Sequence, residues 1–217
     1  MTPWRAALSL ALAAFVLWRN LPAALLCLWP RLMRARGEDE SWPRVDRFLF
    51  TQMEEELSPL GFKRLGVHVE RAPLARGELA YDFVHDAEHT WATATVQGEE
   101  ARLVLLTPFE GGAFVRTADH KVASLERDGE CLSGGMVGAE PEHLFAAHRR
   151  RVERLKESGR VAQADLSLEA RVKAADRWIG GWGARELRIK NLNGLAMTVV
   201  GLAIACAVAW AVWRAGW

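Results

Sequence analysis

The sequence predicts an α+β fold: a helix, an antiparallel β-meander of four to five strands and two further helices, flanked by N- and C-terminal transmembrane helices. Three observations lead to this expectation. Residues 194–213 are 20 consecutive residues without a charge. Within residues 64–117, short stretches alternate apolar and polar side chains, which is typical of β-strands. Residues 141–157 and 168–179 instead carry apolar side chains at helical spacing.

The composition and its charge distribution narrow the class of protein. The chain has 217 residues, 50% of them hydrophobic, which excludes a disordered or collagen-like protein. Three Cys are too few for a scaffold held by disulfides. The formal net charge of +1 is unevenly spread, because residues 1–36 carry five Arg and no acid, whereas residues 37–183 carry 19 bases and 26 acids. This pattern predicts basic ends around an acidic domain.

Residues 1–33 form an apolar region that permits more than one arrangement. A helix is expected from Pro3 to Trp18, followed by a break at which Asn20 could cap a second helix. Either residues 4–29 make one tilted, kinked span, or residues 3–18 cross the membrane and residues 22–33 lie in the interface. A cleaved signal peptide is a third arrangement, but no A-x-A cleavage sequence follows Trp18.

Residues 34–43 are predicted to be a linker, and residues 44–183 a cytoplasmic α+β domain. Its connections between strands are short, so neighbouring strands should be antiparallel. The loss of pattern at 121–138 predicts a loop, and Ser167 is a good N-cap for the last helix. The helices are expected to cover one face of the sheet. The predicted helices are 44–57, 141–157 and 168–179, and the predicted strands are 64–70, 79–85, 91–96, 102–107 and 113–117.

Residues 184–193 are expected to be a basic juxtamembrane segment and residues 194–213 the C-terminal transmembrane helix. At about 1.5 Å per residue, this helix spans about 30 Å, the thickness of the bilayer hydrocarbon core. The positive-inside rule then predicts a multi-pass protein of the cell inner membrane whose central domain is cytoplasmic. The residues expected at the membrane interface are Trp4, Trp18, Trp210, Trp213, Arg31, Arg34, Arg36, Arg185, Arg188 and Lys190.

Small residues recur at four-residue spacing in both apolar segments. Gly201, Ala205 and Ala209 form one such stripe, and Ser9 with Ala13 form another. Stripes of this kind allow close packing of helices in lipid. The expected partners are therefore the lipid bilayer and another membrane protein or a second copy of this chain. The alternative is that alanine serves only as an apolar filler.

Few residues suggest catalytic chemistry. His85, Asp86 and His89 lie in one hairpin turn and could contribute to a metal site, although their spacing matches no established zinc pattern. Cys131 could pair with His143 or His148 as a nucleophile, but no protease signature surrounds it. We therefore expect no cofactor, no catalytic residue and no resident metal, with His85, Asp86 and His89 as the candidates if a metal is bound.

A basic cluster on the helix 141–157 is the strongest candidate for a binding surface. It could contact anionic lipid head groups or an acidic partner, or it could simply be solvated. Nucleic acid is not expected, because no aromatic residues are interleaved with these charges. The cluster consists of Arg149, Arg150, Arg151 and Arg154.

Several short motifs resemble those of an uncharacterised family of bacterial membrane-anchored proteins. The family pattern runs L-G-F, then T-x-F-x-D-G, a second Thr, and a helix with a late His. Here these motifs are Leu60-Gly61-Phe62, Thr107 to Gly111, Thr117 and His148, with Glu110 where the family has Asp. The resemblance covers roughly residues 60–150 and implies no activity or catalytic residue.

Together these observations predict a membrane-anchored cytoplasmic binding or scaffold module without catalytic activity. One alternative is a membrane-tethered metal-dependent hydrolase that uses the turn of His85, Asp86 and His89. Another is a small structural subunit of a larger membrane complex.

Overall fold

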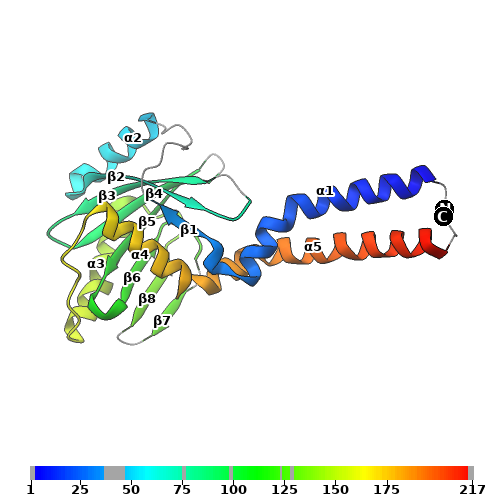
Figure 1. Ribbon diagram of the computed structural model, residues 1–217. Helices are drawn as coiled ribbons and strands as arrows, with labels where there is room; N and C mark the ends of the chain where they lie inside the picture. The colour runs from blue at the N-terminus through cyan, green and yellow to red at the C-terminus, as the bar shows by residue number, and fades with distance from the viewer. Residues whose placement is uncertain are drawn as a thin grey trace. The chain divides into compact units, whose positions relative to one another are not determined.

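The computed structural model describes residues 3–36, 47–74, 77–97, 100–122, 124–127 and 130–214. The chain forms two compact units. The first comprises residues 1–33, 72–76 and 179–217, and the second comprises residues 34–71 and 77–178. Figure 1 shows a pair of long helices in the first unit and a sheet with helices in the second.

The first unit is built on two long apolar helices, α1 (Pro3–Leu28) and α5 (Gly183–Arg214). Figure 1 shows them side by side, and they pack through small residues. Residues 4–28 lie in a single helix that contains Pro22, so Asn20 is not an N-cap; its Nδ2 donates to Val16 O within the helix. A short 3₁₀ turn, η1 (Pro30–Leu32), follows α1. Both long helices are long and apolar enough to cross a membrane.

The second unit contains a sheet of eight strands in the order β1-β2-β3-β4-β5-β6-β8-β7. The predicted antiparallel meander is confirmed as its central five strands. These strands are β2 (Lys63–Arg71), β3 (Glu78–His85), β4 (Thr90–Gln97), β5 (Glu100–Pro108) and β6 (Phe114–Ala118). β2 to β5 are each one to three residues longer than the alternation of side chains indicated, and β6 has the predicted length but is shifted by one residue.

Three further strands extend the meander at its two edges. Residues 34–36, expected to belong to a linker, form β1 (Arg34–Arg36) and pair with β2, while residues 37–43 lie outside the described residues. The loop expected over 121–138 is wrong in part, because it contains β7 (Leu125–Arg127) and β8 (Cys131–Gly135). The strand β8 pairs parallel to β6. Strands this short carry too few residues for an alternation to be recognised.

The helices of the second unit lie on both faces of the sheet. α2 (Arg47–Leu57) and α3 (Pro141–Glu157) pack on one face, where Phe50, Phe83 and Phe145 belong to one buried cluster. α4 (Leu168–Gly180) covers the opposite face, and Ser167 caps it as predicted, with Oγ accepting from Ala170 N. The expectation that all helices share one face is therefore wrong. Short 3₁₀ turns occur at η2 (Ser58–Leu60) and η3 (Glu110–Gly112).

Candidate functional site

A cluster of charged side chains lies buried between the sheet and α4. Asp82 sits in β3 between Tyr81 and Phe83, and the two-residue period of the strand turns it to the opposite face from these aromatic rings. Thr93 of β4 is directly opposite Asp82, and His68 of β2 lies on the same face. Asp82 and His68 are both 0% exposed. The sheet register therefore gathers three polar side chains beneath α4.

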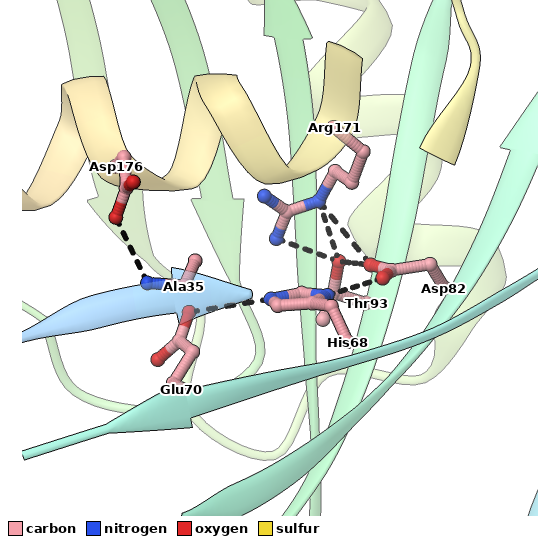
Figure 2. Close-up of polar contacts among 7 residues, drawn as sticks. All are labelled: Ala35, His68, Glu70, Asp82, Thr93, Arg171 and Asp176. Carbon is pink, nitrogen blue, oxygen red and sulfur yellow. Dashed lines mark hydrogen bonds and ion pairs between the residues drawn. The ribbon is translucent and has the colours of Figure 1, made fainter. Parts of the chain in front are cut away.

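Arg171 of α4 completes the cluster from above, as Figure 2 shows. Its Nε lies 3.2 Å from Asp82 Oδ1, and its Nε and Nη2 donate to Thr93 Oγ1 at 3.1 and 2.9 Å. The Thr93 hydroxyl donates in turn to Asp82 Oδ1 at 2.6 Å. Because Arg171 is only 5% exposed, its charge depends on Asp82 for compensation.

His68 lies between two carboxylates. Its Nδ1 bonds to Asp82 Oδ2, and its Nε2 is 3.6 Å from Glu70 Oε1. Burial alone would lower the pKa of His68, but the charge and hydrogen bond of Asp82, together with the nearby Glu70 carboxylate, outweigh burial and raise it. Burial likewise would raise the pKa of Glu70, but His68, together with Arg171 and Arg116, holds it below its ordinary value. A protonated His68 makes the cluster of two cations and two anions neutral.

The same region joins α4 to the edge of the sheet. The backbone N–H of Ala35 in β1 donates to Asp176 Oδ1 of α4 at 2.8 Å, and Ala35 is paired with Glu70. Within the described residues, His68 Nε2 and Arg171 Nη1 are buried without a hydrogen-bond partner. Glu70, with 28% of its side chain exposed, links the cluster to solvent. The arrangement is suited to holding a proton and fastening α4 and β1 to the sheet.

A second polar network lies on the α3 face of the sheet. His148 of α3 is fully buried; its Nε2 contacts Thr107 Oγ1 at 2.9 Å and its Nδ1 contacts Thr117 Oγ1 at 3.0 Å. Burial, with a smaller effect of Arg151, lowers the pKa of His148 to about 3. Thr107, Thr117 and His148 are residues on which the family resemblance rests, and the fold brings all three together. A neutral His bonded at both ring nitrogens is suited to a structural role.

The turn that was considered as a metal site directs its side chains to separate partners. The His85 ring packs against Phe62 and Phe145. Asp86 pairs with Lys63 at 3.0 Å, and His89 Nδ1 lies 3.1 Å from Gln163 O. No group of three or more His, Cys, Asp or Glu that could hold a metal ion is found among the described residues.

Cys131 and His148 lie on opposite faces of the sheet. Leu132, the neighbour of Cys131 in β8, belongs to the apolar cluster under α3, which places Cys131 on the other face. Cys131 is buried, and burial raises the pKa of its thiol to about 11. The nucleophile pair of Cys131 with His148, which the sequence left as an unfavoured alternative, is therefore not formed in the structure.

The basic cluster of α3 is divided between surface and interior. Arg149 pairs with Glu88 at 2.8 Å, and Arg154 pairs with Glu126, while more than half of each arginine side chain stays exposed. Arg150 is also exposed. Arg151 turns inward, where its Nη1 donates to Thr117 Oγ1 at 2.9 Å. Three of the four arginines thus present their side chains to solvent.

The residues expected at the membrane interface lie on the surface. The four tryptophans are exposed along α1 and α5. Arg31 donates through Nε to Gly180 O at 3.3 Å, and Arg34 and Arg36 are exposed in β1. The remaining three, Arg185, Arg188 and Lys190, are exposed in the first turns of α5.

Local sequence pattern does not identify Asp82, Thr93 and Arg171 as members of one site. The available signal was an acid within the apolar strand 79–85 and a base on the inward side of the helix 168–179. A charge inside an apolar stretch predicts a buried partner, but it does not reveal which residue that partner is.

Comparison of the chain with protein-family models, curated proteins and solved structures found no match.

Proposed function

We propose that α1 and α5 anchor this protein in the inner membrane and that its α+β domain is a cytoplasmic binding module. The observation that carries the proposal is the distribution of side chains on the two helices. Small residues lie at the interface between α1 and α5, where Ala13, Gly194 and Gly201 are buried. The large apolar side chains instead point outward, and Phe15, Trp18 and Trp213 are 65%, 76% and 76% exposed. Such a surface is stable in lipid and unfavourable in water.

The proposed orientation rests on basic residues near one end of the helix pair. Cys27 Sγ lies 3.5 Å from Arg188 O, so the end of α1 and the start of α5 are at the same level. Arg31, Arg185 and Lys190 are close to this end in sequence. Basic residues flanking a span favour the cytoplasmic side.

The proposed binding surface is the exposed part of the α3 arginine row. Arg149, Arg150 and Arg154 form a positive patch. The surface ion pairs of Arg149 with Glu88 and of Arg154 with Glu126 each contribute only about 0–1 kcal/mol to stability. A carboxylate or phosphate group of a partner could therefore replace the internal carboxylates. An acidic protein partner or the anionic inner leaflet has the required chemistry.

Cysteine labelling of the full chain tests the anchor and its orientation. In a background in which the three native Cys are replaced by Ala, Ser58→Cys should react with a membrane-impermeant maleimide only after spheroplasts are lysed. The matched variant Arg214→Cys, at the other end of α5, should react in intact spheroplasts. Alkaline carbonate should leave both variants in the membrane pellet. Release by carbonate, or labelling of the cysteine at position 58 in intact spheroplasts, would contradict the proposal.

The same background tests whether the arginine patch binds an acidic group. The variant Arg150→Glu should lose a partner identified by in-cell cross-linking from a probe next to the patch, whereas Arg127→Glu, outside α3, should retain it. Equal cross-linking in both variants would show that the patch is only a solvated surface.

A further inference from the structure

The first unit contains an open cavity of about 410 Å³ on the helix pair. Its walls come from α1, from α5 and from the residues that follow β2. Apolar side chains make up most of the lining, including Leu21, Leu26 and Leu74, and two polar residues, Arg19 and Asn191, complete it. A cavity that is apolar with one cation suits an amphiphilic ligand that carries a negative charge.

Arg19 is unusual because it lies within an apolar helix that would cross the membrane. Ala23 packs against Gly194, and Leu17 packs against Gly201. Ala23 is level with Gly194, the first residue of the uncharged run 194–213. Arg19 therefore lies about 6 Å, or one helical turn, deeper in the proposed membrane span than Ala23. Within the described ranges, the Arg19 guanidinium has neither a carboxylate partner nor a hydrogen bond. A cation at this depth is costly in lipid unless an anion meets it or its side chain reaches the head groups.

Other features of the cavity favour a bound phosphate group. Asn191 uses one N–H for Leu187 O at 2.8 Å and has a second N–H to donate. Leu74, 69% exposed, holds a backbone φ of +59°, which is uncommon for a leucine, and supplies an apolar wall.

From these observations we infer that the cavity binds one anionic phospholipid of the cytoplasmic leaflet. The phosphate group lies against the Arg19 guanidinium and the Asn191 amide, and an acyl chain lies along the apolar wall formed by Leu21, Leu26 and Leu74. Arginine is well suited to this role because its planar guanidinium can donate two parallel hydrogen bonds to a phosphate. This inference rests on the proposed membrane anchor.

The test measures lipid binding to the full chain in detergent by native mass spectrometry, with phosphatidylglycerol and phosphatidylcholine as the probes. Both lipids carry a phosphate, but the choline cation of phosphatidylcholine repels the Arg19 guanidinium, so the wild-type protein should bind one phosphatidylglycerol about tenfold more tightly than phosphatidylcholine. Arg19→Gln should remove this preference, and Arg19→Lys should restore part of it. Arg5→Gln, which removes a charge from the other end of α1, should keep the preference.

A second pair of variants distinguishes a specific loss of lipid binding from misfolding. Leu74→Glu places a negative charge at an exposed wall of the cavity and should weaken phosphatidylglycerol binding, whereas Leu74→Gln should weaken it less. Equal lipid binding by wild-type protein and Arg19→Gln, or an equal loss in Arg5→Gln, would overturn the inference. Displacement of the lipid by inorganic phosphate alone would also overturn it, because the occupant would then be a free anion.

The two proposals fail in distinguishable ways. If Arg19→Gln loses no lipid but stays in the pellet after alkaline carbonate, the lipid site is wrong and the anchor stands. If the wild-type protein is released by carbonate, the anchor is wrong and the lipid site fails with it.

Discussion

Asp82 holds the charged cluster together because its two oxygens serve different partners. One oxygen bonds to His68, and the other accepts from Thr93 and lies 3.2 Å from Arg171 Nε. A buried arginine without its carboxylate would be an uncompensated charge in a medium of low dielectric. The carboxylate also balances His68, so the stability of this face of the sheet depends strongly on one side chain.

We predict that Asp82→Asn lowers the free energy of unfolding by about 3–5 kcal/mol, the usual effect of removing one partner from a buried ion pair. The matched control is Asp86→Asn, which breaks an exposed pair with Lys63 and should change stability by only about 0–1 kcal/mol. Thermal unfolding of both full-length variants in detergent checks this prediction. Similar stabilities for the two variants would show that Arg171 finds compensation elsewhere.

The raised pKa of His68 predicts how stability changes with pH. The pKa is raised from 6.5 because Asp82 and Glu70 outweigh the opposing effect of burial. A raised native pKa means that the folded state binds the proton more tightly than the unfolded state. The stabilisation should be fully present below pH 6.5 and be lost as pH rises from there through the raised native pKa. His68→Gln should flatten this part of the stability profile, whereas His143→Gln, an exposed residue, should leave it unchanged.

Glu70 predicts a second and opposite dependence at acid pH. Its pKa is lowered from 4.5, so its carboxylate stabilises the native state fully above pH 4.5. Stability should decrease as pH falls from there through the lowered native pKa. In Glu70→Gln this acid decrease should become smaller, which unfolding measurements across this pH range can detect. An unchanged acid limb would show that Glu70 is not coupled to His68.

The two long helices pack along an interface whose buried positions in α5 are separated by three, four or seven residues. In α5 these positions are Gly194, Thr198, Gly201 and Val208. The spacing is that of two straight helices crossing at a small angle. Small side chains bring the backbones close, and Thr198 Oγ1 satisfies its hydroxyl within the helix by donating to Gly194 O at 2.8 Å. Packing along this interface therefore stabilises a helix pair whose large apolar side chains point outward.

We predict that Gly194→Leu destabilises the helix pair, although leucine ordinarily favours a helix more than glycine does. A side chain at position 194 would collide with Ala23, and such overpacking typically costs about 1–3 kcal/mol. Ala196→Leu is the control, since Ala196 is exposed. The midpoint of thermal unfolding in detergent should fall for the first variant and change little for the second. An equal midpoint in both variants would mean that α1 moves aside at little cost.

The charge distribution along the chain predicts how the protein inserts. Basic residues close to the ends of apolar spans determine orientation more than basic residues within a long domain. Replacing Arg31, Arg34 and Arg36 with Gln should therefore increase labelling of a cysteine at position 58 in intact spheroplasts. Replacing Arg149, Arg150 and Arg154 with Gln removes the same charge and should leave the labelling unchanged. Equal behaviour of the two triple variants would show that these flanking charges do not set the orientation.

Local periodicity was sufficient for much of the architecture. The helix predicted at 141–157 has the bounds of α3, and every predicted end of a meander strand lies within two residues of the observed end. The candidate site was less accessible to this reasoning. The roles of His68 and Asp82 depend on contacts between residues that are distant in the sequence, and local periodicity does not show such contacts.

Apolar runs and side-chain alternation determined that the sequence has two apolar segments with an α+β domain between them, since each of these properties is set by neighbours in the sequence. The tertiary structure decided that β8 runs parallel to β6, that helices cover both faces of the sheet, and that Arg171 meets Thr93 from 78 residues away. Periodicity shows which side of an element is buried. Only packing in three dimensions decides what that side is buried against, because the free energy of a buried charge depends on the partners that the fold brings within hydrogen-bond distance.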